Sequence, residues 1–184
     1  CVSLLSHTAH GTRVTAVGSR GLGEEGRRVA VRREGEARRG EADGAAAILI
    51  VNEEGLAKIG GKARARIHTM TLAAEDPIVM LGAPIPATRK LLDRSGMSLG
   101  DIGSYEVNEA FASVPMAWAK ALDADMERLN PNGGAIALGH PIGCSGARIL
   151  VTLLSSMEDR DAKRGLATLC IGGGEAVAVV VERV

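Results

Sequence analysis

The stretch LATLCIGGGEAVAVVVERV, residues 166–184, places a glycine triplet between two apolar runs. Both runs have the length and the Val, Ile and Leu content of β-strands, and glycine clusters separate strands, so the stretch predicts a hairpin. Upstream of it, strand-like and helix-like patterns alternate along the chain. Alternation that closes on a hairpin favours an α/β fold, in which helices cover both faces of a mixed β-sheet.

The upstream segments can be divided by period and length. The expected strands are 45–52, 63–74 (an edge-type strand), 102–107 and 135–138, and the expected helices are 53–61, 84–96, 108–122 and 144–159. Glycines are expected to end the first two helices. In the third helix one apolar face is formed by Phe111, Val114, Trp118 and Leu122, and Pro115 is expected to kink or delay the first turn.

The composition excludes several classes of protein. The 184 residues are 46% apolar and carry a formal net charge of zero, which indicates neither nucleic acid nor an acidic membrane surface as a partner. No apolar run reaches the ~20 residues of a membrane span. The three cysteines, Cys1, Cys144 and Cys170, form no Cys-x-x-Cys pair and have no histidine at zinc-ligand spacing. They predict a reduced, cytoplasmic protein without a metal site.

Residues 1–42 differ from the rest of the chain. They are rich in Arg, Glu and Gly and sustain neither a helical nor a strand period. Because large apolar residues are few, the segment is expected to be a poorly ordered leader. A basic nucleic-acid-binding arm is the alternative, although the interspersed acidic residues argue against it. The regular pattern begins at Asp43, so the domain is expected to span residues 43–184.

Three chemically capable residues lie where one expected element meets the next. Asn108 follows a strand, His140 lies in the loop LGHPIGCSG, and Cys170 ends a strand directly before the glycine triplet. Residues at the carboxyl ends of strands in an α/β sheet can converge on one crevice although they are far apart in sequence. A histidine suits proton transfer near neutral pH, and backbone N–H groups beside a thiol suit an oxyanion hole.

Each of these residues also has a structural interpretation. Asn108 could be the N-cap of a helix, His140 could stabilise a Gly/Pro turn, and Cys170 could be a small buried apolar residue. The glycine triplet argues against the last alternative, because it costs conformational entropy unless something approaches its backbone closely. Cys144 is at a helix start, where a thiol can be activated, but no base accompanies it and we expect a small packing residue.

With these motifs, the sequence resembles the C-terminal half of the thiolase family, which makes and cleaves 3-ketoacyl-CoA. VNEAFA (107–112), NPNGGAIALGHPIGCSGARIL (130–150) and LATLCIGGGEAVAVVVERV (166–184) resemble the three C-terminal signatures of the family, in the same order. The resemblance covers about 43–184 and implies a thiolase-like C-terminal domain. DPIVMLGAPIPATRKLL (76–92) resembles the degradative branch of the family, which acts in lipid metabolism on fatty-acyl or steroid side-chain CoA esters.

The resemblance also implies roles for single residues. His140 would belong to the first oxyanion hole, and Asn108 would hold the water that completes it. Cys170 would be the acid/base that exchanges a proton with the CoA sulfur or the substrate α-carbon, and the N–H of Gly172 would stabilise a thioester oxyanion. Two further residues, Ala110 and Phe111, would lie along the pantetheine arm. Coenzyme A would be a substrate, with no permanently bound cofactor.

The sequence departs from the family pattern in its nucleophile. Thiolases react by a ping-pong mechanism, in which a cysteine of a Cys-x-Ser-Gly motif in the N-terminal half first takes the acyl group. Cys1, in CVSLLSH, does not match that motif. We therefore expect an acyltransferase fragment that lacks its nucleophile and is inactive alone. Its partner would be a thiolase N-terminal half or a second copy of the chain.

Two other interpretations remain open from the sequence. The chain could be a non-catalytic subunit of another thiolase-like protein, or a degraded gene product. Just before Asp43, the Gly/Ser/Asn-rich stretch that contacts CoA in the family is replaced by EGEARRGEA, and only the following DGAAA agrees with the family. A shifted reading frame upstream would explain this replacement, and an uninterrupted frame on resequencing would exclude that explanation.

Overall fold

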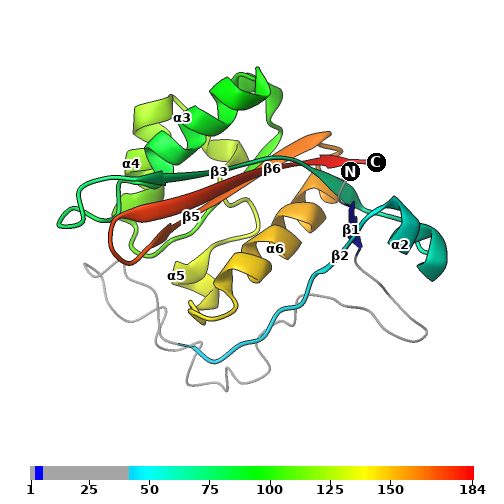
Figure 1. The fold of residues 1–184 in the computed structure, drawn as a ribbon. Helices are drawn as coiled ribbons and strands as arrows, with labels where there is room; N and C mark the ends of the chain where they lie inside the picture. The colour runs from blue at the N-terminus through cyan, green and yellow to red at the C-terminus, as the bar shows by residue number, and fades with distance from the viewer. Residues whose placement is uncertain (1–2, 6–41) are drawn as a thin grey trace.

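The computed structural model describes residues 3–5 and 42–184, which contain a six-stranded sheet of order β2-β1-β3-β6-β5-β4 (Figure 1). The strands are β1 (Ser3–Leu5), β2 (Leu49–Val51), β3 (Ala65–Ala74), β4 (Ser104–Val107), β5 (Arg164–Ile171) and β6 (Glu175–Arg183). β4 and β5 are parallel, and the other neighbouring strands are antiparallel. The expected mixed sheet and its C-terminal hairpin are therefore confirmed.

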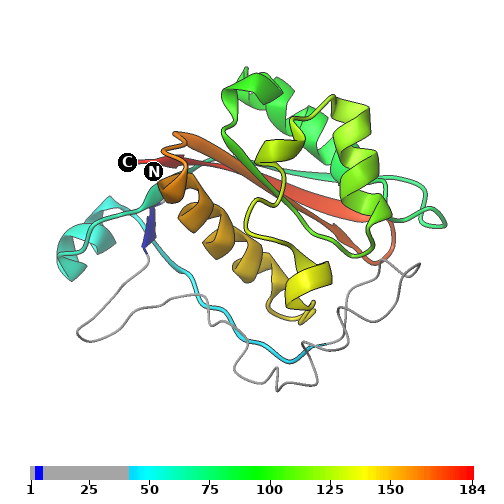
Figure 2. The ribbon, with the colours of Figure 1, turned by 180° about the vertical axis from the view of Figure 1, so that it is seen from behind.

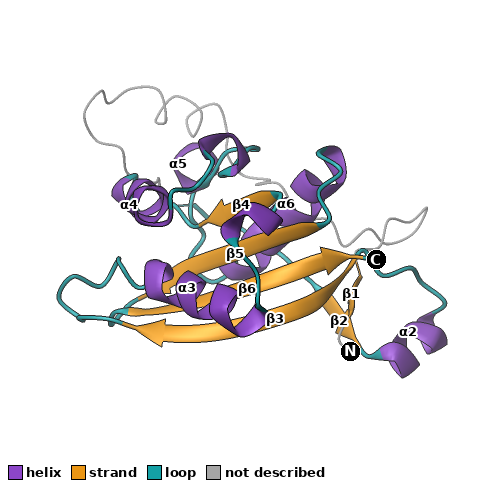
Figure 3. Ribbon diagram, turned by 90° about the horizontal axis from the view of Figure 1, so that it is seen from above, coloured by secondary structure: helices purple, strands orange, loops and turns teal. Residues whose placement is uncertain are grey.

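Helices cover both faces of this sheet, as expected. They are α2 (Glu53–Ile59), α3 (Pro84–Ser95), α4 (Ser113–Leu122), α5 (Ala135–Leu138) and α6 (Ser145–Asp159), with 3₁₀ turns at Leu99–Asp101 and Met126–Arg128. α3 lies across β3 and β6 on one face, where α4 packs beside it, and α6 lies behind β4 and β5 on the other (Figure 3). Each face has its own buried apolar cluster, because neighbouring residues of one strand, such as Leu166 and Ala167, point to opposite sides.

Local signals placed the first two helices correctly. Gly60 and Gly96 follow α2 and α3 with φ of 68° and 67°, the left-handed conformation that ends a helix at little cost for glycine. Proline at the first position of α3 starts that helix, since proline needs no N–H partner there. No helix among the described residues is long and apolar enough to cross a membrane.

Three expectations about the strands need correction. Residues 135–138 form the short helix α5 instead of a strand, because four apolar residues carry no period that separates the two. Only Leu49–Val51 of the apolar run 45–52 is in a strand. The expected edge strand, β3, pairs with β1 at Ala65 and Arg66. The rest of β3 pairs only with β6 and forms an edge of the described sheet.

The helix expected from Asn108 begins five residues later, at Ser113. Pro115 lies in its first turn, where the missing N–H breaks no bond, so the proline delays the helix instead of kinking it. Phe111 precedes the helix and is 43% exposed, whereas Val114 and Trp118 are buried. Trp118 packs on Tyr105 of β4, with ring centroids 5.5 Å apart, which fixes α4 against the sheet.

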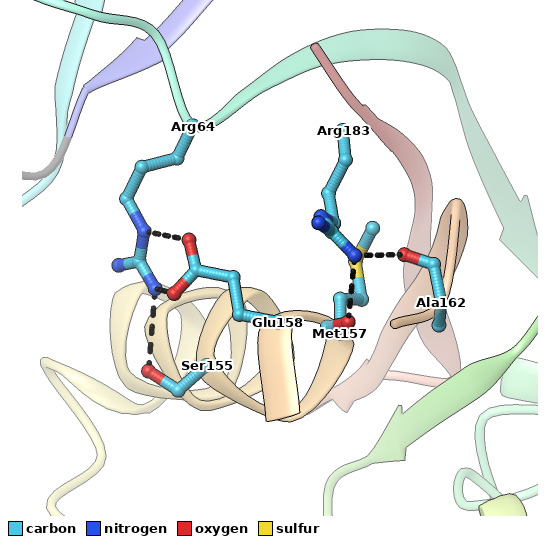
Figure 4. Close-up of polar contacts among 6 residues, drawn as sticks. All are labelled: Arg64, Ser155, Met157, Glu158, Ala162 and Arg183. Carbon is cyan, nitrogen blue, oxygen red and sulfur yellow. Dashed lines mark hydrogen bonds and ion pairs between the residues drawn. The ribbon is translucent and has the colours of Figure 1, made fainter. Parts of the chain in front are cut away.

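Two arginines hold the C-terminal end of α6 (Figure 4). Arg64 donates from Nε and Nη2 to the Glu158 carboxylate at 2.7 and 2.6 Å. Arg183 donates from Nη1 to the carbonyl oxygens of Met157 and Ala162. Carbonyls in the last turn of a helix have no intrahelical partner and the helix end carries partial negative charge, so these cations stabilise it. The direction of α6 across the sheet is thereby fixed.

The expected leader, residues 1–42, lies outside the described residues except for Ser3–Leu5 and Ala42. Its order and the boundary at Asp43 therefore remain predictions. The same applies to Cys1.

Candidate active site

Asn108 and Cys170 lie at the same end of two neighbouring parallel strands. The last ladder pair of β4 and β5 joins Val107 to Thr168. Directly beyond it, the N–H of Asn108 donates to the Thr168 carbonyl oxygen at 3.0 Å. Cys170 follows Thr168 by two residues on β5, about 7 Å further along that strand. The strand ends thus bring both residues to one edge of the sheet, as the alternation of elements predicted.

The Asn108 side chain is buried in an unusual way. Its residue is 2% exposed, and its Oδ1 atom has no hydrogen-bond partner among the described residues. It is not a helix N-cap, because the cap of α4 is Ala112. The structural interpretation of Asn108 is therefore wrong. A buried amide oxygen without a partner costs about 1–3 kcal/mol, a cost that is common at functional sites.

A hydrogen-bond network connects the segment after β4 to the loop that carries His140. The Asn130 amide spans Val107, accepting from its N–H at 2.8 Å and donating to its carbonyl oxygen at 2.9 Å. It also donates to Glu109 Oε1 at 3.0 Å, and Glu109 Oε2 accepts from the N–H of Ile136 at 2.8 Å. Glu109 thus caps α5, which lies at the end of the sheet where β5 turns into β6 (Figures 1 and 2).

His140 is half-buried and oriented by Ser145, the first residue of α6. Its Nδ1 atom is 2.5 Å from Ser145 Oγ, which in turn donates to the Pro141 carbonyl oxygen at 2.9 Å. A hydroxyl has one proton, so Ser145 accepts from Nδ1 when it donates to Pro141. This places the proton of the neutral imidazole on Nδ1 and leaves Nε2 as the basic nitrogen.

The position of α6 brings this histidine to the same edge of the sheet. The Ser104 and Ser156 hydroxyls are 2.8 Å apart. Because α6 leads through a short turn into β5, which is parallel to β4, α6 runs antiparallel to β4. From Ser156 back to Ser145 the helix covers about 16 Å. From Ser104 forward to Asn108 the strand covers about 13 Å. Ser145, with His140 bonded to it, is therefore nearly level with Asn108.

The glycine triplet forms the tight turn between β5 and β6. Gly173 and Gly174 have φ of 96° and 87°. A Cβ atom on Gly174 would lie 2.8 Å from the Glu75 carbonyl oxygen and 3.0 Å from Pro77 Cα. Gly172 is exposed, and no atom of the described residues lies within 4 Å of the position of a Cβ atom there. The triplet thus forms the turn and lets Gly174 approach the backbone of residues 75–77 closely. Among the described residues it leaves open space around Gly172.

The other predicted site residues differ in exposure. Ala110 is 5% exposed and Phe111 is 43% exposed, so a ligand could reach the ring of Phe111 more easily than the methyl group of Ala110. Cys144 precedes α6 and is half-buried, with its sulfur 3.5 Å from the position of a Cβ atom on Gly44. That close packing fits a small residue. Among residues 3–5 and 42–184 no group of three His, Cys, Asp or Glu side chains could hold a metal ion.

Sequence reasoning missed the buried charged residues beneath the site. Glu106 on β4 is 1% exposed. Within the part of the chain that the structure describes, its Oε1 atom has no hydrogen-bond partner, and neither do Nε and Nη1 of Arg148 on α6. Burial raises the pKa of Glu106 to about 8, although Arg148 opposes the rise; nearby Glu109 adds to it. The segment SYEV contains the signal that could have revealed this buried charge, because a glutamate inside a buried strand needs a partner.

Replacement of this glutamate should change how stability depends on pH. The native state keeps the Glu106 proton up to about pH 8, whereas the unfolded chain loses it near its ordinary pKa of 4.5. The contribution of Glu106 to stability therefore falls as pH rises through this window. Relative to Glu106→Gln, the wild type should lose free energy of unfolding between about pH 5 and pH 8. Urea titrations measure this, with exposed Glu127→Gln as the control, and parallel profiles for the wild type and E106Q would contradict the buried acid.

The sequence and the fold of this chain are similar to those of known proteins. The family model for the thiolase C-terminal domain matches residues 61–183. This chain belongs to the thiolase family. The match includes Asn108, Ala110, Phe111, His140, Cys170 and Gly172, and it confirms the resemblance to a thiolase C-terminal half.

Individual relatives are similar over the same region. The steroid 3-ketoacyl-CoA thiolase FadA6 of Mycobacterium tuberculosis is 49% identical over 142 residues, which are 77% of this chain and 35% of the relative. The 3-ketoacyl-CoA thiolase of Vibrio vulnificus is 52% identical over 145 residues, 77% of this chain and 38% of the relative. The chain therefore spans little more than a third of the length of these thiolases.

Solved thiolase structures have the same fold. The acetyl-CoA acetyltransferase of Bacillus anthracis superposes with a TM-score of 0.77 at 42% identity, covering 80% of this chain and 38% of the other. Human mitochondrial 3-ketoacyl-CoA thiolase superposes with a TM-score of 0.78 at 40% identity, covering 81% and 38%. The mixed sheet with helices on both faces is thus a thiolase-like C-terminal domain.

Proposed function

We propose that this chain supplies the acid/base and oxyanion-binding part of a thiolase active site that cleaves or forms 3-ketoacyl-CoA. The observation that carries the proposal is the placement of Asn108, His140 and Cys170 at one end of the sheet, held by the Asn130–Glu109–Ile136 bonds and by Ser145. The names of the relatives, 3-ketoacyl-CoA thiolases, support this reaction.

In the cleavage direction, a cysteine nucleophile attacks the 3-keto carbon, and the bond between Cα and Cβ breaks with its electrons moving to Cα. Cys170 gives its proton to that carbon, which releases acetyl-CoA and leaves an acyl-enzyme. The Cys170 thiolate then takes the proton of the CoA thiol, and the CoA sulfur accepts the acyl group from the nucleophile. One thiol thus acts first as acid and then as base, which restores the starting state.

The remaining site residues stabilise charge and hold the substrate. His140 would first take the proton of the cysteine nucleophile on Nε2 and would then donate that N–H to the oxyanion on the 3-keto carbon, which Asn108 would also bind through a water molecule. The N–H of Gly172 would bind the thioester oxyanion, and the open space around this glycine fits an approaching carbonyl. The pantetheine arm of CoA would pass Ala110 and Phe111. CoA is then a substrate, and no permanently bound cofactor is needed.

The nucleophile in this proposal comes from outside the 184 residues. Neither half-buried Cys144 nor Cys1 lies in a Cys-x-Ser-Gly motif, so an N-terminal thiolase half must complete the site, in this polypeptide or in a second one. Homo-oligomers of the completed protein, and a cytoplasmic location, belong to the same proposal. Fatty-acyl or steroid side-chain CoA esters of the degradative branch are the proposed substrates.

A chimera tests this function. In it, residues 43–184 replace the matching segment of the Vibrio vulnificus thiolase, so that the relative supplies the nucleophile. We expect the chimera to cleave a 3-ketoacyl-CoA in the presence of CoA, and the 184-residue chain alone to show no turnover. A folded chimera without activity would favour a non-catalytic subunit, and turnover by the chain alone would mean that Cys1 or Cys144 acts as nucleophile.

A further inference from the structure

A row of buried polar side chains lies between β4 and α6. Tyr105 and Val107 of β4 point into the apolar cluster on the face that α3 and α4 cover. The residues that alternate with them, Ser104, Glu106 and, directly after the strand, Asn108, point to the face that α6 covers. Each of the three is 2% exposed or less. Ser104 is hydrogen-bonded to Ser156 on α6. The other two each have an oxygen, Oε1 of Glu106 and Oδ1 of Asn108, that no atom of residues 42–184 pairs with. The reaction proposed above gives Glu106 no role.

Arg148 faces this row from α6. It precedes Ser156 by eight residues, a little over two turns, so both residues lie within one stripe of the helix roughly 100° wide. Its guanidinium lies near enough to Glu106 to lower the pKa of that carboxyl against the effect of burial. Its Nε and Nη1 atoms are buried without hydrogen-bond partners among the described residues. Nε and Nη1 of Arg148 as donors, and Glu106 Oε1 and Asn108 Oδ1 as acceptors, are therefore all buried away from water in the layer between β4 and α6.

The register of helix and strand matches Arg148 to Asn108. Eight residues of helix separate Arg148 from Ser156, about 12 Å. Four residues of strand separate Asn108 from Ser104, about 13 Å. Because Ser104 and Ser156 are in contact, the backbone of Arg148 lies at about the same height along the strand direction as the backbone of Asn108. Glu106 lies between Asn108 and the serine pair. Buried unpaired donors and acceptors each cost about 1–3 kcal/mol, so rotation of the long arginine side chain into a bond is favoured.

We propose that Arg148 is a positioning residue for Asn108: its guanidinium donates a hydrogen bond to Asn108 Oδ1 and thereby turns the Nδ2 hydrogens toward the active site. Glu106 keeps the guanidinium in the layer. The amide then presents donors to the site instead of an acceptor, which is the polarity that binding an oxyanion through water requires. The catalytic consequence rests on the proposed function, but the orientation of the amide does not.

The orientation is tested first in the 184-residue chain itself. In ¹⁵N-labelled protein the side-chain amide signals of Asn108 are assigned by their loss in Asn108→Asp. Arg148→Met should shift both proton signals and raise their exchange with solvent about 10-fold or more, because the fixed oxygen is released. Arg160→Met is the matched control, since Arg160 follows the same helix but is exposed. Asn108 signals that respond no more to R148M than to R160M would overturn the proposal.

Two further measurements keep the test decisive. If R148M does not fold, Arg148→Lys replaces it in the same comparison, because a lysine keeps the charge but loses the planar fork. In the chimera, Arg148 variants should lower kcat about 10–100-fold with KM within about two-fold, as expected when an oxyanion group is misaligned. An unchanged kcat in an active chimera would overturn the proposal. If the wild-type chimera is inactive, the proposed function fails and the Asn108 signals alone decide on the amide orientation.

Discussion

Replacement of Cys170 by serine should lower kcat of the chimera by about 10²–10⁴-fold, the usual contribution of a general acid/base. The hydroxyl of serine is a far weaker acid than a thiol, so it can neither protonate the departing carbanion nor hold the negative charge left behind. KM should change little, because the side chains have similar size and the turn after β5 is unaffected. Steady-state thiolysis of a 3-ketoacyl-CoA measures both constants.

Cys144→Ser is the matched control for this experiment. Cys144 is also half-buried and also lies near glycines in the sequence, but it packs against Gly44 at the start of α6. The proposal expects C144S to retain kcat within about three-fold, in keeping with a surface or packing substitution. Equal losses in the two variants would contradict a specific acid/base role for Cys170.

Gly174→Ala should cause a large loss of stability. Its φ of 87° is unfavourable for a residue with a Cβ atom, and the new atom would meet backbone atoms of residues 75–77 at 2.8–3.2 Å. The two effects together should lower the free energy of unfolding by about 2–4 kcal/mol. For a chain of this length the melting temperature should fall by about 4–15 °C.

Gly172→Ala is the control on the same turn, because no atom of the structurally described segments lies within 4 Å of the added methyl and φ is not positive. Its free energy of unfolding should stay within about 1 kcal/mol of the wild type, with a small gain from reduced freedom of the unfolded chain. Thermal unfolding of both variants makes the comparison. A G174A protein as stable as G172A would contradict the close approach of the 75–77 loop to this turn.

The sequence predicts the framework of the fold because its signals are local. Gly60 and Gly96 end helices by adopting a conformation that only glycine reaches cheaply, and the hairpin around the glycine triplet follows from residue type alone. The strand ends carrying Asn108 and Cys170 could be placed together from the alternation of strands and helices.

Other features depend on contacts between distant segments, and no local pattern contains them. The helix at 135–138 is capped by Glu109, and the charge that opposes the raised pKa of buried Glu106 comes from Arg148, 42 positions later on α6. The position of Phe111 outside α4 likewise follows from the NEAF loop, which Asn130 holds against β4. These tertiary interactions override the periodic signal of short segments.

The most direct test of the central claim follows the proton that Cys170 is proposed to move. In D₂O with excess acetyl-CoA, the active chimera should exchange the methyl protons of acetyl-CoA for deuterium, which mass spectrometry detects without any net reaction. We expect exchange with the wild-type chimera and with C144S, and its loss with C170S. Exchange at the wild-type rate in C170S would contradict the assignment of Cys170 as the acid/base of the site.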